Sequence, residues 1–209
     1  MCVDMVEKDQ YQCPRGAEGK EVIKKMNEHH RDLTIWGLYN IPKSSAKNVL
    51  DIGCGGGNCL KLLSVKYPNA KCVGVDISED CVESTLELNK VFHSWGKVDA
   101  MVASVEDLPF PEKTFDIVTA VETYFFWPDL KANIAHIASR LNDKGVLCIV
   151  SEQYFTESNR TELAKTCEEF HMNLVDNDVL RSHMEAAGLS TEVIVDEEKN
   201  WVTFLGTKN

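Results

Sequence analysis

A short acidic and glycine-rich stretch contains the residues best suited to chemistry. Asp51 ends an apolar run, and Gly53, Gly55 and Gly57 follow at alternate positions before Asn58 opens a helical apolar pattern. Glycine is needed where a turn takes unusual backbone angles or where a ligand must lie against bare backbone. A helix that begins there offers unpaired N–H groups, and open α/β sheets bind nucleotides at the carboxyl ends of their strands. The stretch therefore predicts a strand, a tight turn and a helix around a nucleotide.

The spacing of the glycines separates two kinds of nucleotide. Loops that bind dinucleotides follow G-x-G-x-x-G, which brings a pyrophosphate onto the helix N-terminus. Here the spacing is D-x-G-x-G-x-G, and Asn58 stands where the third dinucleotide glycine would be. An acid at the head of the loop repels a pyrophosphate but can pair with an ammonium group. Cys54, inside the loop, is expected to contribute its backbone rather than its thiol.

A second acid follows the next apolar run. The run beginning at Lys71 ends in Asp76, nineteen residues after Gly57. In a βαβ nucleotide fold, an acid at this place accepts hydrogen bonds from ribose hydroxyls. Ser78 is expected to cap the helix that follows. Asp76, Ile77 and Ser78 are therefore predicted to surround a nucleoside, without distinguishing one nucleotide from another.

Several stretches together resemble class I S-adenosylmethionine (SAM) dependent methyltransferases. The glycine loop resembles their motif I, the strand that ends in Asp76 their motif II, and the "FD" plus apolar run within residues 114–121 their motif IV. The sequences LPF at 108–110 and WP at 127–128 resemble small-molecule methyltransferases of the quinone-biosynthesis type. The resemblance covers roughly residues 45–209. It implies SAM as cofactor, S-adenosylhomocysteine as product, and in-line transfer of a methyl group to a small molecule.

The resemblance also implies contacts with SAM. Asp51 would help to hold its amino-acid end, and the loop at 53–58 would let its sulfur and ribose approach. The family usually has an Asp that recognises adenine where this sequence has Ser104. A Ser hydroxyl can still accept one hydrogen bond, or the role moves to Glu106 or to the backbone alone. The backbone N–H of Val105 is expected to meet a ring nitrogen.

The stretch after the fourth predicted strand should face the methyl group. Glu122 is followed by four consecutive aromatic residues, Tyr124 to Trp127. Neighbouring side chains in an extended stretch diverge, so some of these rings must line a cavity, and aromatic faces favour cations such as a sulfonium. Glu122 lies beside the cofactor and could hold a substrate amine or accept a proton; alternatively it pairs with an Arg or Lys. Glu122 and Tyr124 are the predicted catalytic residues, and Trp127 is a predicted substrate contact.

Two segments are expected to cover the site. Residues 1–44 form an arm, extended or partly disordered to residue 18, followed by cap helices from residue 19 and over 34–40. His30 and Trp36 would roof the substrate pocket, although Trp36 could instead pack on the sheet; Tyr11 either folds over the cofactor or belongs to a frayed terminus. Residues 152–176 resemble a lid insertion, in which Glu152, Tyr154 and His171 would contact substrate.

The elements predict one α/β domain over residues 45–209. It would be a Rossmann-like, doubly wound sheet of seven strands, mostly parallel with an antiparallel last strand, preceded by a helical cap. A chain of 209 residues is long enough for a full core. The acceptor and the oligomeric state, monomer or homodimer, are not indicated.

Composition limits the partners. The net charge of −11 argues against a nucleic-acid substrate and favours a neutral or cationic small molecule, although solubility alone explains it. No apolar run is long enough for a membrane span, and the first residues lack the features of a signal peptide, so a cytoplasmic enzyme is expected. The eight cysteines include no C-x-x-C pair, which favours reduced thiols over a disulfide frame or a metal site.

Three alternatives remain open from the sequence. A nicotinamide-dependent, NAD(P)-type oxidoreductase would share the βαβ unit but not the glycine spacing. A non-catalytic SAM-binding protein would keep the loop and lack a substrate cavity. A metalloid methyltransferase would need two or more cysteines converging near the methyl group.

Overall fold

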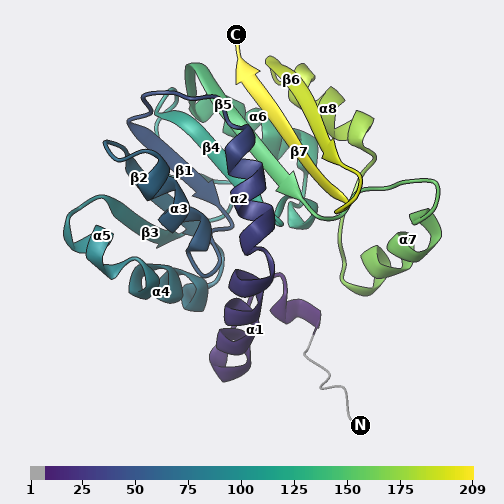
Figure 1. Cartoon of the computed structure of the whole chain (residues 1–209), viewed down its shortest axis with the longest axis horizontal. Coiled ribbons are helices and arrows are strands. Elements are labelled where there is room, and N and C mark those ends of the chain that lie inside the picture. Colours follow the sequence, from purple (N-terminus) through teal and green to yellow (C-terminus); the bar gives the residue numbers. More distant parts are fainter. Residues whose placement is uncertain (1–7) are drawn as a thin grey trace.

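The computed structural model describes residues 8–209, which form a central sheet with helices on both faces (Figure 1). The order of the strands is β3-β2-β1-β4-β5-β7-β6. Strands β1 to β5 pair in parallel, whereas β7 runs antiparallel to β5 and to β6. This confirms the predicted seven-stranded, doubly wound sheet with an antiparallel last strand. The strands are β1 Asn48–Ile52, β2 Lys71–Asp76, β3 Val98–Val102, β4 Phe115–Val121, β5 Leu141–Ser151, β6 Leu189–Asp196 and β7 Trp201–Lys208.

The central strands are continuous apolar runs because helices cover both of their faces. Successive side chains of a strand point to opposite faces, so Val49 joins one core cluster while Leu50 and Ile52 join the other. In the edge strand β6, only Leu189 is buried, and the other side chains are half-buried or exposed. The apolar sequence of β1 therefore reflects its place at the centre of the sheet.

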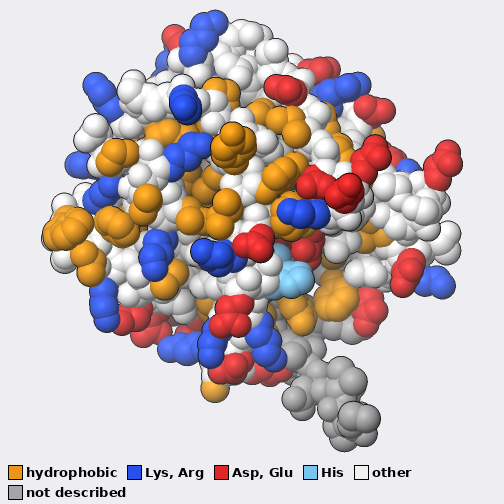
Figure 2. Space-filling model, in the orientation of Figure 1, with side chains coloured by type: hydrophobic (Ala, Val, Ile, Leu, Met, Phe, Trp, Pro, Cys, Tyr) orange, Lys and Arg blue, Asp and Glu red, His pale blue; other side chains and the backbone are white. Residues whose placement is uncertain are grey.

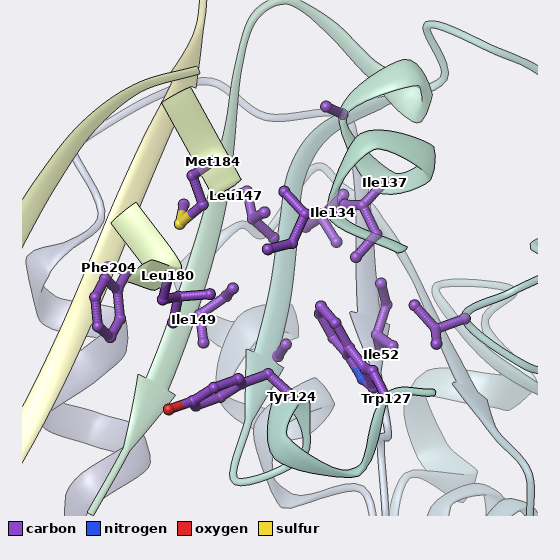
Figure 3. Close-up of a cluster of buried hydrophobic side chains, with 14 of the residues drawn as sticks. Ile52, Tyr124, Trp127, Ile134, Ile137, Leu147, Ile149, Leu180, Met184 and Phe204 are labelled. Atoms are coloured by element: carbon purple, nitrogen blue, oxygen red, sulfur yellow. The ribbon is translucent and has the colours of Figure 1, made fainter. Parts of the chain in front are cut away.

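Each face of the sheet is packed by its own helices. Helices α2 and α3 contact strands of one face, and α6 and α8 contact strands around the other core cluster. Figure 3 shows the second cluster, in which Ile134 and Ile137 of α6 and Leu180 and Met184 of α8 point toward the sheet. The helices are α1 Gly16–His29, α2 Arg31–Asn40, α3 Asn58–Lys66, α4 Glu79–Leu88, α5 Lys90–Ser94, α6 Leu130–Arg140, α7 Arg160–Glu169 and α8 Asn177–Ala186, with short 3-10 turns η1 Lys8–Gln10 and η2 Tyr124–Phe126.

The N-terminal segment is more ordered than the sequence predicts. Residues 8–15 are not an extended arm: they contain η1, and α1 begins at Gly16 rather than at residue 19. The Ser78 hydroxyl donates to the carbonyl of Pro14, and the Gly16 N–H donates to Asp80 Oδ2 at 2.6 Å. These bonds attach the segment to the start of α4, which local sequence does not reveal. Residues 1–7 of the predicted arm lie outside the described residues.

The loops of functional interest gather at one edge of the sheet. Helix α1 lies at the edge where the parallel strands end, and the segment carrying α7 leaves the sheet after β5 at the same edge (Figure 1). Helix α7 falls within residues 152–176, where the sequence predicts an inserted helix. Among residues 8–209, no helix combines the length and apolar character needed to cross a bilayer.

Candidate active site

The β1–α3 loop is built from glycines in a left-handed backbone conformation. Gly53, Gly55 and Gly57 have φ angles of 67°, 52° and 80°, which residues with a side chain rarely adopt. A Cβ on Gly53 would lie 2.3 Å from Thr123 Oγ1, whereas one on Gly55 would meet no atom nearer than 4.0 Å. The turn thus requires glycine at position 53, and at position 55 it leaves bare backbone beside open space.

A cavity of about 250 Å³ lies along this loop, slightly below the ~300–1,000 Å³ typical of small-ligand sites. Its wall combines the ends of β1, β2, β3 and β4 with the N-terminal segment and α1. Thirteen of the residues that the sequence singles out lie in this wall: His30, Asp51, Gly53, Cys54, Gly55, Asn58, Asp76, Ile77, Ser104, Val105, Glu106, Glu122 and Trp127.

Asp51 carries an unpaired buried oxygen. Its side chain is only 2 % exposed, and its Oδ1 accepts a hydrogen bond of 2.6 Å from the Thr119 hydroxyl. Its Oδ2 has no hydrogen-bond partner among residues 8–209. Burial raises the pKa of Asp51 to about 6 despite the bond from Thr119. Because buried polar groups are normally paired, this oxygen in a cavity wall fits a cationic group such as the ammonium of SAM.

Backbone N–H groups fix the position of the Asp76 carboxylate. Its two carboxylate oxygens accept N–H bonds from Gly55 and Ser78, each 2.9 Å long. Burial raises the pKa of Asp76, and these bonds oppose the rise. Each oxygen of a carboxylate can accept more than one hydrogen bond, so Asp76 can still receive ribose hydroxyls. Ile77, which is 48 % exposed, presents an apolar surface beside it.

The predicted adenine end is a short turn. The Ser104 hydroxyl accepts a 3.2 Å bond from the Glu106 N–H and lies 3.4 Å from Glu106 Oε2. Val105 between them is buried but reaches the cavity wall. The turn therefore offers a hydroxyl and a carboxylate, both of which can accept a hydrogen bond from an exocyclic amino group.

Glu122 also lines the cavity, and its backbone conformation is strained. Its φ angle is +54°, a conformation that costs a non-glycine residue energy and often marks functional sites. Its Oε1 accepts a bond of 2.6 Å from the Glu152 N–H. Burial raises the pKa of Glu122 to about 7; the nearby charge of His30 opposes this rise and that of Glu152 adds to it. A carboxyl group near neutrality can bind or release a proton at physiological pH.

His30 and Glu152 form an ion pair beside Glu122. His30 Nε2 lies 3.7 Å from Glu152 Oε1, and the more exposed His29 reaches the same carboxylate at 3.2 Å. Burial disfavours the charged form of His30, but Glu152 and Glu122 outweigh it and raise its pKa. On the face shown in Figure 2, a histidine surface lies beside acidic side chains. Contrary to the alternative of an Arg or Lys partner for Glu122, its charged neighbour is His30.

His29, His30 and Glu152 also form the one group among residues 8–209 with spacing suited to a metal, since their ligand atoms lie within 4.8 Å of one another. These side chains already pair with each other, and that of His29 is 66 % exposed. We therefore interpret the group as an ion-paired chain, and the expected absence of a metal stays a prediction.

Tyr124, a predicted catalytic residue, is not among the residues that line the cavity. It is 1 % exposed and belongs to the core. Figure 3 shows its hydroxyl pointing away from Trp127. The backbone turns into η2 directly after β4, so alternate aromatic residues do not face the site as they would in a strand. Phe126 and Trp127 line the cavity instead.

Six other predicted contacts lie outside the cavity wall, among them Glu152, which pairs with His30. Gly57 packs against α4, where a Cβ would be 2.7 Å from Asn89 Nδ2. The hydroxyl of Ser78 caps α4 by accepting the N–H of Cys81. The other three are the predicted substrate contacts Trp36, Tyr154 and His171.

The structure explains the positions of these three residues. The ring of Trp36 packs on that of Trp201 at 5.7 Å, which is the alternative that the sequence allowed. Tyr154 lines a separate groove beneath α7. His171 is exposed, with a φ of +54°. All three residues lie outside the cavity because of the rotation of their helix or the path of their loop, and local sequence specifies both poorly.

Some lining residues were missed by the sequence analysis. Met26, Asn27 and Thr34 reach the cavity from the α1–α2 region, and the Asn27 amide donates to the Gly56 carbonyl at 3.1 Å. The helical spacing that places Met26 and His30 on one face was a usable signal for this wall. Tyr11 also lines the cavity, and its ring meets the edge of Phe170 at 5.4 Å. This favours the alternative in which Tyr11 folds over the site.

Three cysteines line the cavity, but at its cofactor end. Cys54, Cys59 and Cys81 lie near Asp51 and Asp76. Burial raises the pKa of each thiol above its ordinary value. Because the thiolate is the reactive and metal-binding form, these groups are poorly suited to metalloid chemistry.

Comparisons with known proteins agree with this geometry. A family model described as "Methyltransferase domain" matches residues 27–193. The chain is 32% identical over 121 residues to trans-aconitate 2-methyltransferase of Afipia carboxidovorans, which covers 57% of this chain and 42% of that protein. It is 29% identical over 160 residues to the O-methyltransferase cnsE of Penicillium expansum, covering 75% and 57%. The chain thus spans about half the length of these relatives.

A solved structure shares the fold. The complex between the Haloferax volcanii Trm112 methyltransferase activator and the putative methyltransferase superposes with a TM-score of 0.79 at 19% identity, covering 96% of this chain and 97% of that one. The match to the family model over residues 27–193 spans more than half of the sequence and includes the glycine loop and its acids. The chain belongs to the class I SAM-dependent methyltransferase family, whose cofactor is SAM.

Proposed function

We propose that this protein transfers a methyl group from SAM to a small-molecule acceptor. The observation that carries the proposal is a single cavity with two different ends. One end has the glycine loop and the unpaired oxygen of Asp51, and the other has Glu122 and His30 between aromatic walls. A site that only stored SAM would not need a strained, near-neutral carboxyl group at its second end.

In this proposal, different residues bind SAM and the acceptor. SAM, when bound, supplies an electrophilic methyl group on a sulfonium. Asp51 pairs with the ammonium of its amino-acid end, Asp76 accepts from the ribose hydroxyls, and the bare backbone at Gly55 permits close approach. Phe126 and Trp127 exclude water from the acceptor end, where positioning and desolvation supply most of the rate. Glu122 orients the acceptor and removes its proton where that is required.

The covering segments belong to the same proposal. We assign residues 1–44 to an arm and cap, residues 45–209 to the methyltransferase domain, and residues 152–176 to a lid. Support comes from Tyr11 on Phe170, and from the Asn173 N–H, which donates to the Phe125 carbonyl at 2.6 Å. These contacts join the insertion to the N-terminal segment and to η2.

The acceptor named in the first relative does not suit this cavity. Aconitate is an anion, and the described residues that line the cavity include no lysine or arginine. We therefore propose a different acceptor class for this chain.

The proposal extends to the location and the assembly of the protein. The seven cysteines among residues 8–209 are all unpaired, which is typical of a reducing compartment such as the cytoplasm. A monomer or homodimer is expected, and light scattering of the purified protein measures which one forms.

The test uses the purified chain. Calorimetry with SAM and, in parallel, with NADH should show one SAM site and no NADH binding. Incubation with SAM and a metabolite panel should then release S-adenosylhomocysteine with particular acceptors. Failure to bind SAM at saturating concentration would contradict the proposal, as would NADH binding that SAM does not displace.

A further inference from the structure

The cavity is lined by acids without basic side chains to balance them. Asp51, Asp76, Glu106 and Glu122 all reach its wall, and among the described lining residues the single cationic candidate is His30. An anionic acceptor entering this space would meet like charges in a low dielectric, where they repel strongly. The charge of the wall therefore selects for a neutral or cationic acceptor.

Most of these acids have a task in binding SAM. Asp51 faces the ammonium and Asp76 the ribose under the proposed function, and Glu106 sits with Ser104 at the adenine end. Glu122 remains at the acceptor end. Its immediate charged neighbours are His30 and Glu152. When His30 is protonated it cancels one of the two carboxylates, so the group of three keeps one net negative charge for a ligand.

The walls beside Glu122 are apolar and aromatic. Phe126 and Trp127 follow Glu122 in the chain and line the same cavity, and so does Met26 of α1. Aromatic faces attract cations, most strongly when water is excluded. A carboxylate with aromatic neighbours is an arrangement that recognises an alkylammonium group rather than a bare hydroxyl.

We propose that the acceptor is a small primary or secondary amine with an apolar or aromatic substituent, and that Glu122 binds and deprotonates its nitrogen. This inference rests on the proposed methyl transfer. The ammonium gives one proton to the Glu122 carboxylate, leaving a lone pair on nitrogen. An N–C bond then forms while the C–S bond breaks, and its electron pair stays on sulfur. The methylated ammonium leaves with S-adenosylhomocysteine, and Glu122 returns its proton to water.

The surroundings of Glu122 suit a base working near neutrality. The groups that face it are His30 from the α1–α2 junction, Glu152 and the Ser151 hydroxyl from the end of β5, and Tyr124 from its own segment. Protonation of Glu122 would remove the charge that holds the amine. Binding of an amine should therefore weaken as pH falls through about 7, the pKa to which burial raises Glu122.

The test uses three probes of one shape and different charge. Benzylamine, benzyl alcohol and benzoate are titrated at pH 8 into protein saturated with S-adenosylhomocysteine. We expect benzylamine to bind at least tenfold more tightly than benzyl alcohol, and benzoate to bind least. With SAM in place of the product, mass spectrometry should detect N-methylbenzylamine.

Two variants test whether the preference for benzylamine depends on Glu122. Glu122→Gln should reduce the preference for benzylamine over benzyl alcohol at least tenfold. Glu112→Gln removes an equal charge from an exposed position outside the cavity wall and should leave the preference unchanged. Retained binding of S-adenosylhomocysteine checks that each variant is folded.

The outcomes separate this inference from the proposed function. Absence of SAM binding contradicts the proposed function itself. With SAM binding intact, the amine inference is overturned if benzoate binds as tightly as benzylamine, if no probe binds, or if Glu122→Gln behaves like Glu112→Gln. Loss of activity on adding a chelator would also overturn it, because that would assign the acceptor end to a metal.

Discussion

The two ends of the cavity are constructed differently. The cofactor end is local: Asp51, Gly53 and Gly55 lie within five residues, and Asp76 follows one helix later. The acceptor end brings together His30, Glu122 and Glu152, although His30 and Glu152 are 122 positions apart in the chain. A motif that binds a constant ligand can be short, because neighbouring backbone supplies the contacts. An end that recognises a variable acceptor draws side chains from separate segments.

The largest effect is expected at the turn where both ends meet. Gly53→Ala combines a φ of 67° with a Cβ only 2.3 Å from Thr123 Oγ1. We expect a loss of about 3 kcal/mol or more in the free energy of unfolding and no measurable SAM binding by calorimetry. At Gly96 the φ is 66°, and an added Cβ would meet no atom of residues 8–209 within 4 Å. Gly96→Ala should therefore lose about 1 kcal/mol from backbone strain and bind SAM normally. If the two variants lose equal stability and bind SAM equally, the left-handed backbone, and not the contact with Thr123, determines the effect at Gly53.

The next effect tests the acceptor end. Glu122→Gln should lower kcat with the true acceptor by about 10²–10⁴-fold, the usual contribution of a general base. The dissociation constant of S-adenosylhomocysteine should change far less, because this ligand has no sulfonium charge. Steady-state kinetics and calorimetry on the same sample measure the two. If the variant keeps full turnover, Glu122 is not a catalytic residue.

The matching variant at the cofactor end is Asp51→Asn. A lost hydrogen bond to a charged group costs about 1.5–3 kcal/mol, which predicts roughly 10- to 150-fold weaker SAM binding. In the native protein, an ammonium ligand favours the ionised form of Asp51, whose pKa is raised to about 6. SAM should therefore bind more weakly as pH falls through about 6, and calorimetry in two buffers should detect proton release. Binding that is independent of pH between 5 and 8 would contradict the pairing with Asp51.

The raised pKa of Glu122 should make the free energy of unfolding depend on pH. The pKa of Glu122 rises from 4.5 to about 7 on folding, so folding favours its protonated form. That stabilisation is fully present below pH 4.5 and is lost as pH rises through 7, by about 1–3 kcal/mol. Glu122→Gln should therefore be more stable than the native protein at pH 8 and similar to it near pH 4.5. Urea unfolding at both pH values measures this, and a variant less stable at pH 8 would show that the carboxylate supports the fold.

The smallest effect is expected for the tyrosine that sequence reasoning placed in the site. The Tyr124 hydroxyl is buried and has no hydrogen-bond partner in the described part of the chain. Tyr124→Phe should therefore change the free energy of unfolding by less than about 1 kcal/mol, and in the stabilising direction. Turnover should stay within about twofold, as expected of a substitution outside a site. A large loss of kcat in this variant would mean that Tyr124 turns into the cavity during the reaction.

The sequence by itself predicted the fold class, a seven-stranded sheet with an antiparallel last strand, and the residues proposed to bind the cofactor. Apolar runs that end in Asp51 and Asp76 and a glycine loop between them are local patterns, and the contacts they make are with adjacent backbone. The same locality explains why Glu122 was identified: it directly follows a strand of recognisable type.

Only the tertiary structure decided which side chains surround Glu122. The direction of Tyr124 depends on the turn that η2 makes after β4, and the place of Trp36 on the phase of α2 against Trp201. The pairing of His30 with Glu152, and the return of Tyr11 to the cavity mouth, are contacts between distant segments. Such contacts depend on how whole elements pack, and no short window of sequence specifies the angle and depth at which two elements meet.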